Sequence, residues 1–218
     1  MRLSNLFGRT LRDAPADADM TSHALLVRAG MVRPLASGIY AYLPLGWEVI
    51  RRLMAILREE MARVGGQEMR MPLVTPGELW QRTGRWQEVG SELVRFRDRA
   101  ERDMVLAMTH EETVTELARF VVQSYRDLPT VVYHIQSKMR DEPRPRGGLI
   151  RMREFLMKDA YSFHTDEADL DQFFGHMRRA YETVFAQVDL SPIVIEALSG
   201  MMGGRGSVEF SLPHPVGE

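Results

Sequence analysis

Apolar residues recur at helical spacing in two long stretches of the chain, and both stretches predict amphipathic helices. In residues 47–64 the apolar positions are Val49, Ile50, Leu53, Ile56, Leu57, Met61 and Val64. In residues 166–188 they are Leu170, Phe173, Phe174, Met177, Tyr181, Val184, Phe185 and Val188. Gly65 and Gly66 predict the end of the first helix. The aromatic residues of the second are interpreted as core rather than as a cofactor site.

Shorter patterns predict the remaining elements. Helices are expected at residues 21–29, 76–85 and from 111 or 112 to 125. Strands are expected within 35–43 and at 68–71, 131–137, 150–163, 193–198 and 208–212. The glycines between 200 and 206 predict a tight turn, because they match neither the Walker loop nor the Rossmann fingerprint. Strands that interleave irregularly with helices indicate an α+β domain with a mostly antiparallel sheet covered by helices.

The composition excludes several classes of protein. The 218 residues are 44% hydrophobic and 27% charged, as in ordinary globular proteins. The absence of cysteine excludes disulfides and thiolate metal sites, and the six histidines lie far apart without zinc spacing, so no metal ligand is assigned. No apolar run approaches the length of a membrane span, and a cytoplasmic protein is expected. The net charge of -2 does not indicate a nucleic-acid-binding surface overall.

Basic residues are nevertheless concentrated in residues 138–158. They are Lys138, Arg140, Arg144, Arg146, Arg151, Arg153 and Lys158, against Asp141, Glu142 and Glu154. If the chain is a strand here, Arg140 and Glu142 share a face because side chains alternate. An arginine fork binds phosphate or carboxylate, and a carboxylate accepts from an exocyclic amine. A surface strand with paired charges is the alternative.

The residues that follow strengthen the first interpretation. Two prolines and two glycines between 143 and 148 predict a loop, and Arg151, Arg153 and Phe155 then fall on one face of a returning strand. Such a hairpin would be lined with cations. Phe155 either stacks on a purine, worth roughly 1 to 3 kcal/mol, or is a core residue.

Thr109 and Glu111 form a second candidate site at the predicted helix start. Thr109 as N-cap, with acidic residues in the first turn, explains this composition structurally. If both residues face the basic hairpin, the carboxylate of Glu111 can hold an amine while Arg140 holds the carboxylate of the same ligand. That arrangement would suit an amino acid.

These residues resemble a known family. RDEPRPRGGLIRMREFLMKDAYSFH (residues 140–164) resembles motif 2 of class II aminoacyl-tRNA synthetases, specifically of the bacterial type of prolyl-tRNA synthetase. The resemblance extends to LASGIYAYLPLGWEV, ELWQRTGRW, THEE and SYRDLP, and to a helix and strand ending in MRMPLVTP that resemble motif 1. Motif 1 covers about residues 47–76 and motif 2 about residues 138–164.

The resemblance implies a fold, a reaction and an assembly. The fold is the class II synthetase-like antiparallel sheet of six or seven strands flanked by helices. The reaction is ATP-dependent activation of proline to prolyl-adenylate, then transfer to tRNA(Pro). The assembly is a homodimer formed through the motif 1 helix and Pro72.

The family's binding residues carry over by position. Arg140 would bind the α-phosphate of ATP and the proline carboxylate, and is the catalytic residue. Glu142 would bind the adenine amine, Arg151 the outer phosphates and Phe155 the adenine face. Thr109 and Glu111 would hold the proline nitrogen. Mg²⁺ would be bound mainly through the phosphates, with no protein ligand assigned.

Residues 1–218 are expected to be an incomplete catalytic core, because motif 3 and the editing and anticodon-binding domains of the family are absent. Four positions near the site depart from the family pattern: Met108, Met139, Gly147 and Val208. Two alternatives stay open. One is a non-catalytic module that binds proline, ATP or a partner, and the other is an adenylating enzyme for another amino acid such as serine or threonine.

Overall fold

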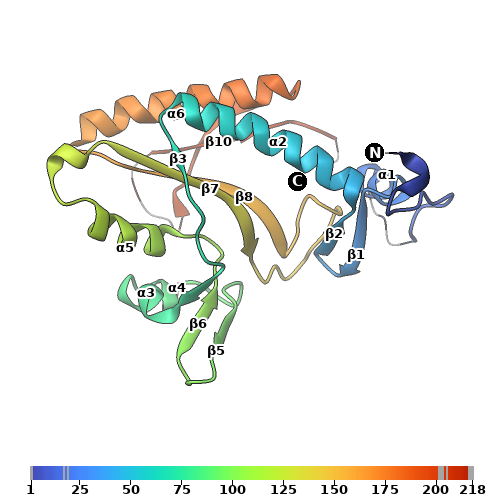
Figure 1. Ribbon diagram of the computed structural model, residues 1–218, viewed down its shortest axis with the longest axis horizontal. Coiled ribbons are helices and arrows are strands. Elements are labelled where there is room, and N and C mark those ends of the chain that lie inside the picture. The colour runs from blue at the N-terminus through green and yellow to red at the C-terminus, as the bar shows by residue number, and fades with distance from the viewer. Residues whose placement is uncertain (1, 17, 19, 201–203, 205, 216–218) are drawn as a thin grey trace.

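The computed structural model describes residues 2–16, 18, 20–200, 204 and 206–215 (Figure 1). The helices are α1 (Thr21–Arg28), α2 (Pro44–Arg63), α3 (Gly77–Arg82), α4 (Arg85–Glu88), α5 (Glu111–Val121) and α6 (Glu167–Gln187). The strands are β1 (Val32–Ala36), β2 (Ile39–Tyr42), β3 (Gln67–Glu68), β4 (Val74–Pro76), β5 (Arg95–Arg97), β6 (Asp103–Leu106), β7 (Thr130–Met139), β8 (Glu154–Phe163), β9 (Ile193–Ala197) and β10 (Ser207–Ser211). Single 3₁₀ turns lie at Leu3–Asn5 and Tyr125–Asp127.

The long antiparallel hairpin of β7 and β8 is the centre of the fold. It is paired over its whole length, from Thr130 opposite Phe163 to Met139 opposite Glu154. Helices α2 and α6 lie side by side along this hairpin (Figure 1). Met61 of α2, Tyr133 of β7 and Ala180 of α6 are buried together, which fixes both helices on the sheet. Burying a large apolar side chain contributes about 1.5 to 3 kcal/mol.

A second, smaller unit lies beside α5 and carries its own core. Strands β4, β6 and β5 form an antiparallel sheet that packs with α3 and α4. Its buried core consists of Trp80, Val89, Leu93, Val105 and Met108. The indole nitrogen of Trp80 donates to the hydroxyl of Thr75 at 3.2 Å, so its polar atom is satisfied inside this core.

Two further hairpins complete the structure. β1 pairs with β2 near the N-terminal end of α2 (Figure 1), and β9 pairs with β10. Phe210 of β10 lies between two rings of α6, with centroids 5.5 Å from Tyr181 and 5.4 Å from Phe185. The predicted aromatic face of this helix is therefore partly covered, although Leu170 and Phe174 are exposed rather than core.

The predicted α+β class and the antiparallel character of the sheet are confirmed. One pairing is parallel, because β3 runs alongside β7 for two residues. The described strands divide into sheets of three, three, two and two strands, so the expected count of six or seven strands in one sheet is not met within the described residues. Beyond β3, the amide of Met69 still bonds the carbonyl of Tyr133 at 2.8 Å, and the amide of Met71 bonds the side chain of Gln136 at 2.9 Å.

Several predicted boundaries were wrong for local reasons. The strand expected at 68–71 is only the two-residue β3. The helix expected at 76–85 is divided by Gly84, whose φ of +80° ends the helical conformation. Helix α5 ends at Val121, because Ser124 and Asp127 form a capping box around the next turn. The predicted glycine-rich turn lies partly outside the described residues. Among the described helices, none has the length and apolarity needed to cross a bilayer.

Candidate functional site

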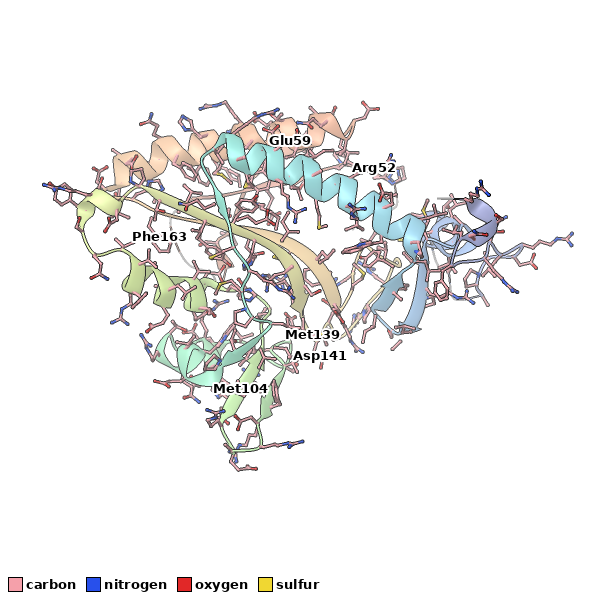
Figure 2. All side chains as sticks on the ribbon, in the orientation of Figure 1. Arg52, Glu59, Met104, Met139, Asp141 and Phe163 are labelled. Atoms are coloured by element: carbon pink, nitrogen blue, oxygen red, sulfur yellow. The ribbon has the colours of Figure 1, made fainter. Side chains whose placement is uncertain are left out.

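The chain turns sharply where β7 ends at Met139. The amide of Arg140 still bonds Arg153 at 2.9 Å, but the amide of Glu142 bonds the carbonyl of Arg140 at 2.7 Å. Figure 2 labels Met139 and Asp141 at this end of the hairpin and Phe163 at the other. The prediction that Arg140 and Glu142 lie in a strand was therefore wrong. Glu142 closes a tight turn, because the prolines that follow have no amide to continue the pairing.

The predicted nucleotide-binding side chains nevertheless meet in one place. Arg140, Glu142, Arg151 and Phe155 all line a single open pocket of about 690 Å³. The carbon of the Arg140 guanidinium lies 5.4 Å from the centre of the Phe155 ring, within the range of cation–π attraction. This contact fixes the position of Arg140 over an aromatic wall. The loop, rather than strand alternation, brings the four side chains together.

The charges of this pocket are partly paired with one another. The Nε atom of Arg151 lies 3.0 Å from a carboxylate oxygen of Glu142, and the amide of Arg144 donates to the other oxygen at 3.2 Å. The hydrogen bond from Arg151, together with that amide, lowers the pKa of Glu142. Glu142 is therefore a carboxylate at neutral pH and can act as an acceptor.

Arg153 does not join this group. Its Nε donates to the backbone carbonyl of Glu142 at 3.0 Å and lies 3.3 Å from Asp141. The expected common face of Arg151, Arg153 and Phe155 was wrong because β8 begins only at Glu154. Arg153 stabilises the turn through its bond to the carbonyl of Glu142, while Arg151 and Phe155 line the pocket.

The hairpin of β1 and β2 supports the loop from outside. The carbonyl of Gly38 accepts from the amide of Arg153 at 2.9 Å. Gly38 has a φ of +74°, and a Cβ there would lie 2.8 Å from Pro145. Gly147 has a φ of +65°, and a Cβ there would lie 2.5 Å from the sulfur of Met20. At Gly38 both the close approach and the positive φ favour glycine, whereas at Gly147 the positive φ does, because the methionine side chain can move.

Thr109 and Glu111 lie at the start of α5, next to this pocket rather than in it. The N-cap of α5 is His110, not Thr109 as the helix-start interpretation expected. The hydroxyl of Thr109 donates instead to the carboxylate of Glu111. Thr109 is buried, and Glu111 borders a separate cavity of about 290 Å³. The predicted nucleotide site and the predicted amine site of Thr109 and Glu111 are therefore neighbours that do not share one pocket.

Arg140 connects the two halves. One terminal nitrogen of its guanidinium lies 3.4 Å from the backbone carbonyl of Met108, the residue before Thr109. Met108 is itself buried in the core of the smaller unit. Met108, where the resemblance predicts a departure from the family pattern, therefore lies in this core immediately before Thr109 in the chain.

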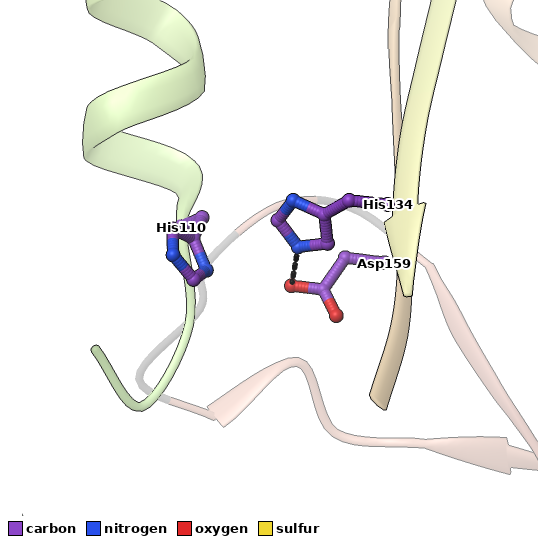
Figure 3. Close-up of side chains that lie close together, drawn as sticks. All are labelled: His110, His134 and Asp159. Atoms are coloured by element: carbon purple, nitrogen blue, oxygen red, sulfur yellow. Dashed lines mark ion pairs between the residues drawn. The ribbon is translucent and has the colours of Figure 1, made fainter. Parts of the chain in front are cut away.

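A buried polar cluster beneath the site was not predicted. The ammonium of Lys138 lies 2.7 Å from Nδ1 of His110, 2.8 Å from Nε2 of His134 and 2.9 Å from Oδ2 of Asp159. The hydroxyl of Tyr161 donates to the same Oδ2 at 2.8 Å. Figure 3 shows that the two histidines and the aspartate come from the start of α5, from β7 and from β8. Lys138, which belongs to the basic segment of residues 138–158, is fully buried.

Burial and pairing perturb the cluster strongly. Burial lowers the pKa of His110 to about 4, although its bond to a backbone carbonyl opposes this change. Burial also lowers the pKa of Lys138, against the attraction of Asp159. For Asp159, burial would raise the pKa, but the adjacent His134 ring and the ammonium of Lys138 bring it down to about 2. Asp159 is therefore charged and His110 neutral at pH 7.

One sequence signal could have revealed this cluster. His134, Gln136 and Lys138 alternate along a strand whose length and neighbours place it in the core. A polar row on one face of a buried strand has to be paired internally, since buried polar groups are almost always hydrogen-bonded. The histidines are distant in sequence but not in space.

The sequence and the fold can be compared with those of known proteins. Residues 94–215 match the family model described as tRNA synthetase class II core domain (G, H, P, S and T). Over all 218 residues the chain is 49% identical to a proline–tRNA ligase of Coprothermobacter proteolyticus and 52% identical to one of Salinispora tropica. It spans 39% and 37% of the length of these curated relatives.

Two solved structures share the fold. The prolyl-tRNA synthetase of Giardia lamblia in complex with prolyl-adenylate superposes with a TM-score of 0.74 at 22% identity, over 79% of this chain and 36% of that one. The prolyl-tRNA synthetase of Cryptosporidium parvum complexed with L-proline and AMP gives a TM-score of 0.76 at 15% identity, over 91% and 42%. The family match covers more than half of the chain and agrees with the fold. The chain therefore belongs to the family of the tRNA synthetase class II core domain (G, H, P, S and T).

Proposed function

We propose that this chain is the part of a proline–tRNA ligase that binds proline and ATP and joins them as prolyl-adenylate. The identity of about 50% to proline–tRNA ligases along the whole chain supports the choice of amino acid. The pocket lined by Arg140, Glu142, Arg151 and Phe155 is the observation that carries the proposal. It combines two cations, one acceptor and one aromatic face, as an adenine nucleotide requires.

Each pocket residue has a role that fits its chemistry. Phe155 offers its face to adenine, and the carboxylate of Glu142 accepts from the exocyclic amine of the base. Arg151 binds the outer phosphates. Arg140 binds the α-phosphate and the proline carboxylate together, because its planar guanidinium presents several donors at once.

Thr109 and Glu111 are proposed to hold the proline nitrogen. Their side chains already contact each other, so a secondary ammonium that approaches this pair meets a carboxylate and a hydroxyl. It shares the carboxylate of Glu111 with Arg85, which lies 3.5 Å away. Arg140 lies one residue away from Thr109 through the carbonyl of Met108. Proline would thus lie across the boundary between the two cavities, with its carboxylate toward the nucleotide.

The proposed reaction needs no general base. The proline carboxylate is already deprotonated, and one of its oxygens attacks the α-phosphorus. The bond from that phosphorus to the bridging oxygen breaks, and pyrophosphate leaves with the electron pair. The protein contributes position and charge stabilisation, chiefly from Arg140.

Mg²⁺ is proposed to enter with the phosphates of ATP. Glu142 is the one carboxylate that lines the pocket among the described residues, and Arg151 already pairs with it. This side-chain set does not make a dedicated magnesium site, since Mg²⁺ prefers several oxygen ligands in an octahedron. No step of the mechanism is therefore assigned to protein-bound metal.

The remaining features of the function concern the whole protein. We propose residues 47–76 as motif 1 and residues 138–164 as motif 2 of one catalytic core, with no part of residues 1–218 assigned to motif 3, editing or anticodon binding. Transfer of the prolyl group to tRNA(Pro), homodimer formation through α2 and Pro72, and a cytoplasmic location complete the proposal.

Exchange of labelled pyrophosphate into ATP tests the first step. We expect exchange that depends on proline and falls by about 100-fold or more in Arg140→Ala, because a preorganised charge at the reacting phosphate is lost. Arg178→Ala is the matched control, since Arg178 lies on α6 and pairs with Glu182 on the surface. It should leave exchange unchanged.

Other outcomes would reject the proposal in different ways. Binding of proline and ATP by calorimetry without exchange would identify a non-catalytic module. Exchange that is faster with serine or threonine than with proline would identify a different amino acid. Exchange that survives Arg140→Ala would remove the proposed role of this arginine.

A further inference from the structure

The ammonium of Lys138 lies at the centre of three acceptor atoms. Nδ1 of His110, Nε2 of His134 and Oδ2 of Asp159 lie 2.7 to 2.9 Å from its Nζ atom. An ammonium has three donors and no acceptor, so it donates to all three atoms when Nε2 of His134 carries no proton. Nε2 then makes no hydrogen bond to Oδ2 of Asp159, which lies 3.1 Å away. Lys138, His110 and His134 are fully buried, and the group is therefore shielded from water.

The far side of His110 fixes the direction of these bonds. The shorter of two contacts of its Nε2 is with the carbonyl of Pro72 at 2.8 Å, which can only accept a hydrogen bond, and the longer is with the side-chain nitrogen of Gln136 at 3.3 Å. The ring therefore carries its proton on Nε2 when neutral, and the lone pair on Nδ1 points at Lys138. Burial keeps the ring neutral at pH 7, with a pKa of about 4.

The same three atoms form a typical ligand set for a divalent metal ion. Two imidazole nitrogens and a carboxylate oxygen lie within 4.8 Å of one another. A zinc ion would need bonds of about 2.0 to 2.2 Å to them. The distances from Nζ are instead those of hydrogen bonds, and a positive charge on Lys138 repels a second cation. The lysine thus fills the space that a metal would use.

The cluster is joined to both halves of the proposed site. His110 lies between Thr109 and Glu111 in the chain, and Lys138 precedes Arg140 by two residues at the end of β7. We propose that the ammonium of Lys138 takes the place of a metal ion among His110, His134 and Asp159, and that it is a positioning group holding Thr109 and Glu111 next to Arg140. The positioning role rests on the proposed function. The proposal that Lys138 occupies the place of a metal ion does not.

Removal of the lysine side chain should open this ligand set to a metal. We expect Lys138→Ala to bind Co²⁺ and to show the visible absorption of a tetrahedral Co²⁺ site, while the unchanged chain shows none. The further change His134→Ala should abolish the signal. Lys158→Ala is the matched control, because Lys158 is also on the hairpin but donates to Tyr181. Absorption in the unchanged chain that His134→Ala removes, or none in Lys138→Ala, would overturn the proposal.

The positioning role is tested by binding. We expect Lys138→Ala to weaken binding of a non-hydrolysable prolyl-adenylate analogue by about 10- to 100-fold, as other indirect supports of a site do. Added Co²⁺ should restore most of that affinity in Lys138→Ala but not when His134→Ala is also present. A purely structural lysine would not give this metal-dependent rescue. If the unchanged chain does not bind the analogue, the proposed function fails, while the Co²⁺ titration still decides the occupancy.

A measurement on the unchanged chain covers the case in which Lys138→Ala does not fold. Imidazole ¹⁵N spectra should show His110 protonated on Nε2 and not on Nδ1. The ammonium protons of Lys138 should exchange slowly enough to be observed, with a correlation to His110. The opposite tautomer, or rapidly exchanging ammonium protons, would contradict the proposed arrangement.

Discussion

His110 is the single residue that should dominate the acid sensitivity of this chain. Its pKa is about 4 in the folded protein and 6.5 as an ordinary value. The unfolded chain therefore binds a proton near pH 6.5 that the folded chain does not take up until about pH 4. Stability is complete above pH 6.5 and is lost as the pH falls toward 4, by about 3 kcal/mol in total. Asp159 titrates lower and adds to the loss only below this window.

Denaturant unfolding between pH 7 and pH 4 measures this effect. His110→Asn keeps an acceptor for Lys138 but cannot titrate, so its stability should change much less between pH 6.5 and 4. His176→Gln is the control, because His176 is exposed on α6 and should leave the pH dependence unchanged. A steep loss in His110→Asn equal to that of the unchanged chain would assign the effect to another group.

The residue types of the candidate site could be predicted from sequence, but the partners that meet in its buried support could not. The chemistry of Arg140, Glu142, Arg151 and Phe155 is local, and the loop with its two flanks contains all four. The partners of Lys138 come instead from the start of α5, from β7 and from β8, and their approach depends on the register of the hairpin. Charge counting grouped this lysine with the arginines of the site, because composition does not distinguish a solvated ammonium from a buried one.

At the scale of elements, one buried ion pair joins α4 to α5. Arg85 lies 2.7 Å from Glu112, and both side chains are at least nine-tenths buried. The guanidinium also lies over Trp80 at 5.0 Å. Removing one partner of a buried pair costs about 3 to 5 kcal/mol when the other charge is left uncompensated. The carboxylate of Glu111 lies 3.5 Å from the same guanidinium and offsets part of this cost. Glu112→Gln should therefore destabilise the chain in urea unfolding, by less than that full amount.

The next turn of α5 provides a matched comparison. Glu116 pairs with Arg82 at 3.0 Å, but both side chains are about half exposed. Exposed pairs contribute about 0 to 1 kcal/mol, so Glu116→Gln should have little effect. Equal losses for the two variants would show that burial does not determine the strength of these pairs.

Among the elements, the long helices were predicted well and the short connections were not. The apolar spacing that predicted α2 and α6 depends only on which residues face a core, and both helices do pack on the core of the hairpin. The turn at Glu142 and the break at Gly84 depend on single backbone conformations that periodicity does not record. Strand alternation was therefore extended too far toward the loop at 143–148 from both sides.

At the scale of the whole molecule, α2 leaves apolar side chains uncovered. Trp47, Val49 and Leu53 are 41%, 46% and 40% exposed, and the last two lie one helical turn apart. The proposed homodimer would cover this face. Sedimentation equilibrium should find a dimer that Leu53→Asp converts to a monomer, because a carboxylate cannot be buried without a partner.

Leu170→Asp is the control for this prediction. Leu170 lies on α6 and is 43% exposed, so the same charge is introduced at the same degree of exposure on a different helix. The dimer should persist in this variant. Dissociation by Leu170→Asp and not by Leu53→Asp would move the interface from α2 to α6.

The ion pair between Arg151 and Glu142 competes with the nucleotide for the same two side chains. On the proposed roles, ATP has to separate these two side chains before each can contact its own part of the nucleotide. The measured affinity is then the free energy of binding the nucleotide less the free energy of breaking this ion pair. Added salt weakens both the phosphate contacts and the internal pair, so ATP binding should depend on ionic strength less steeply than two arginines alone would suggest.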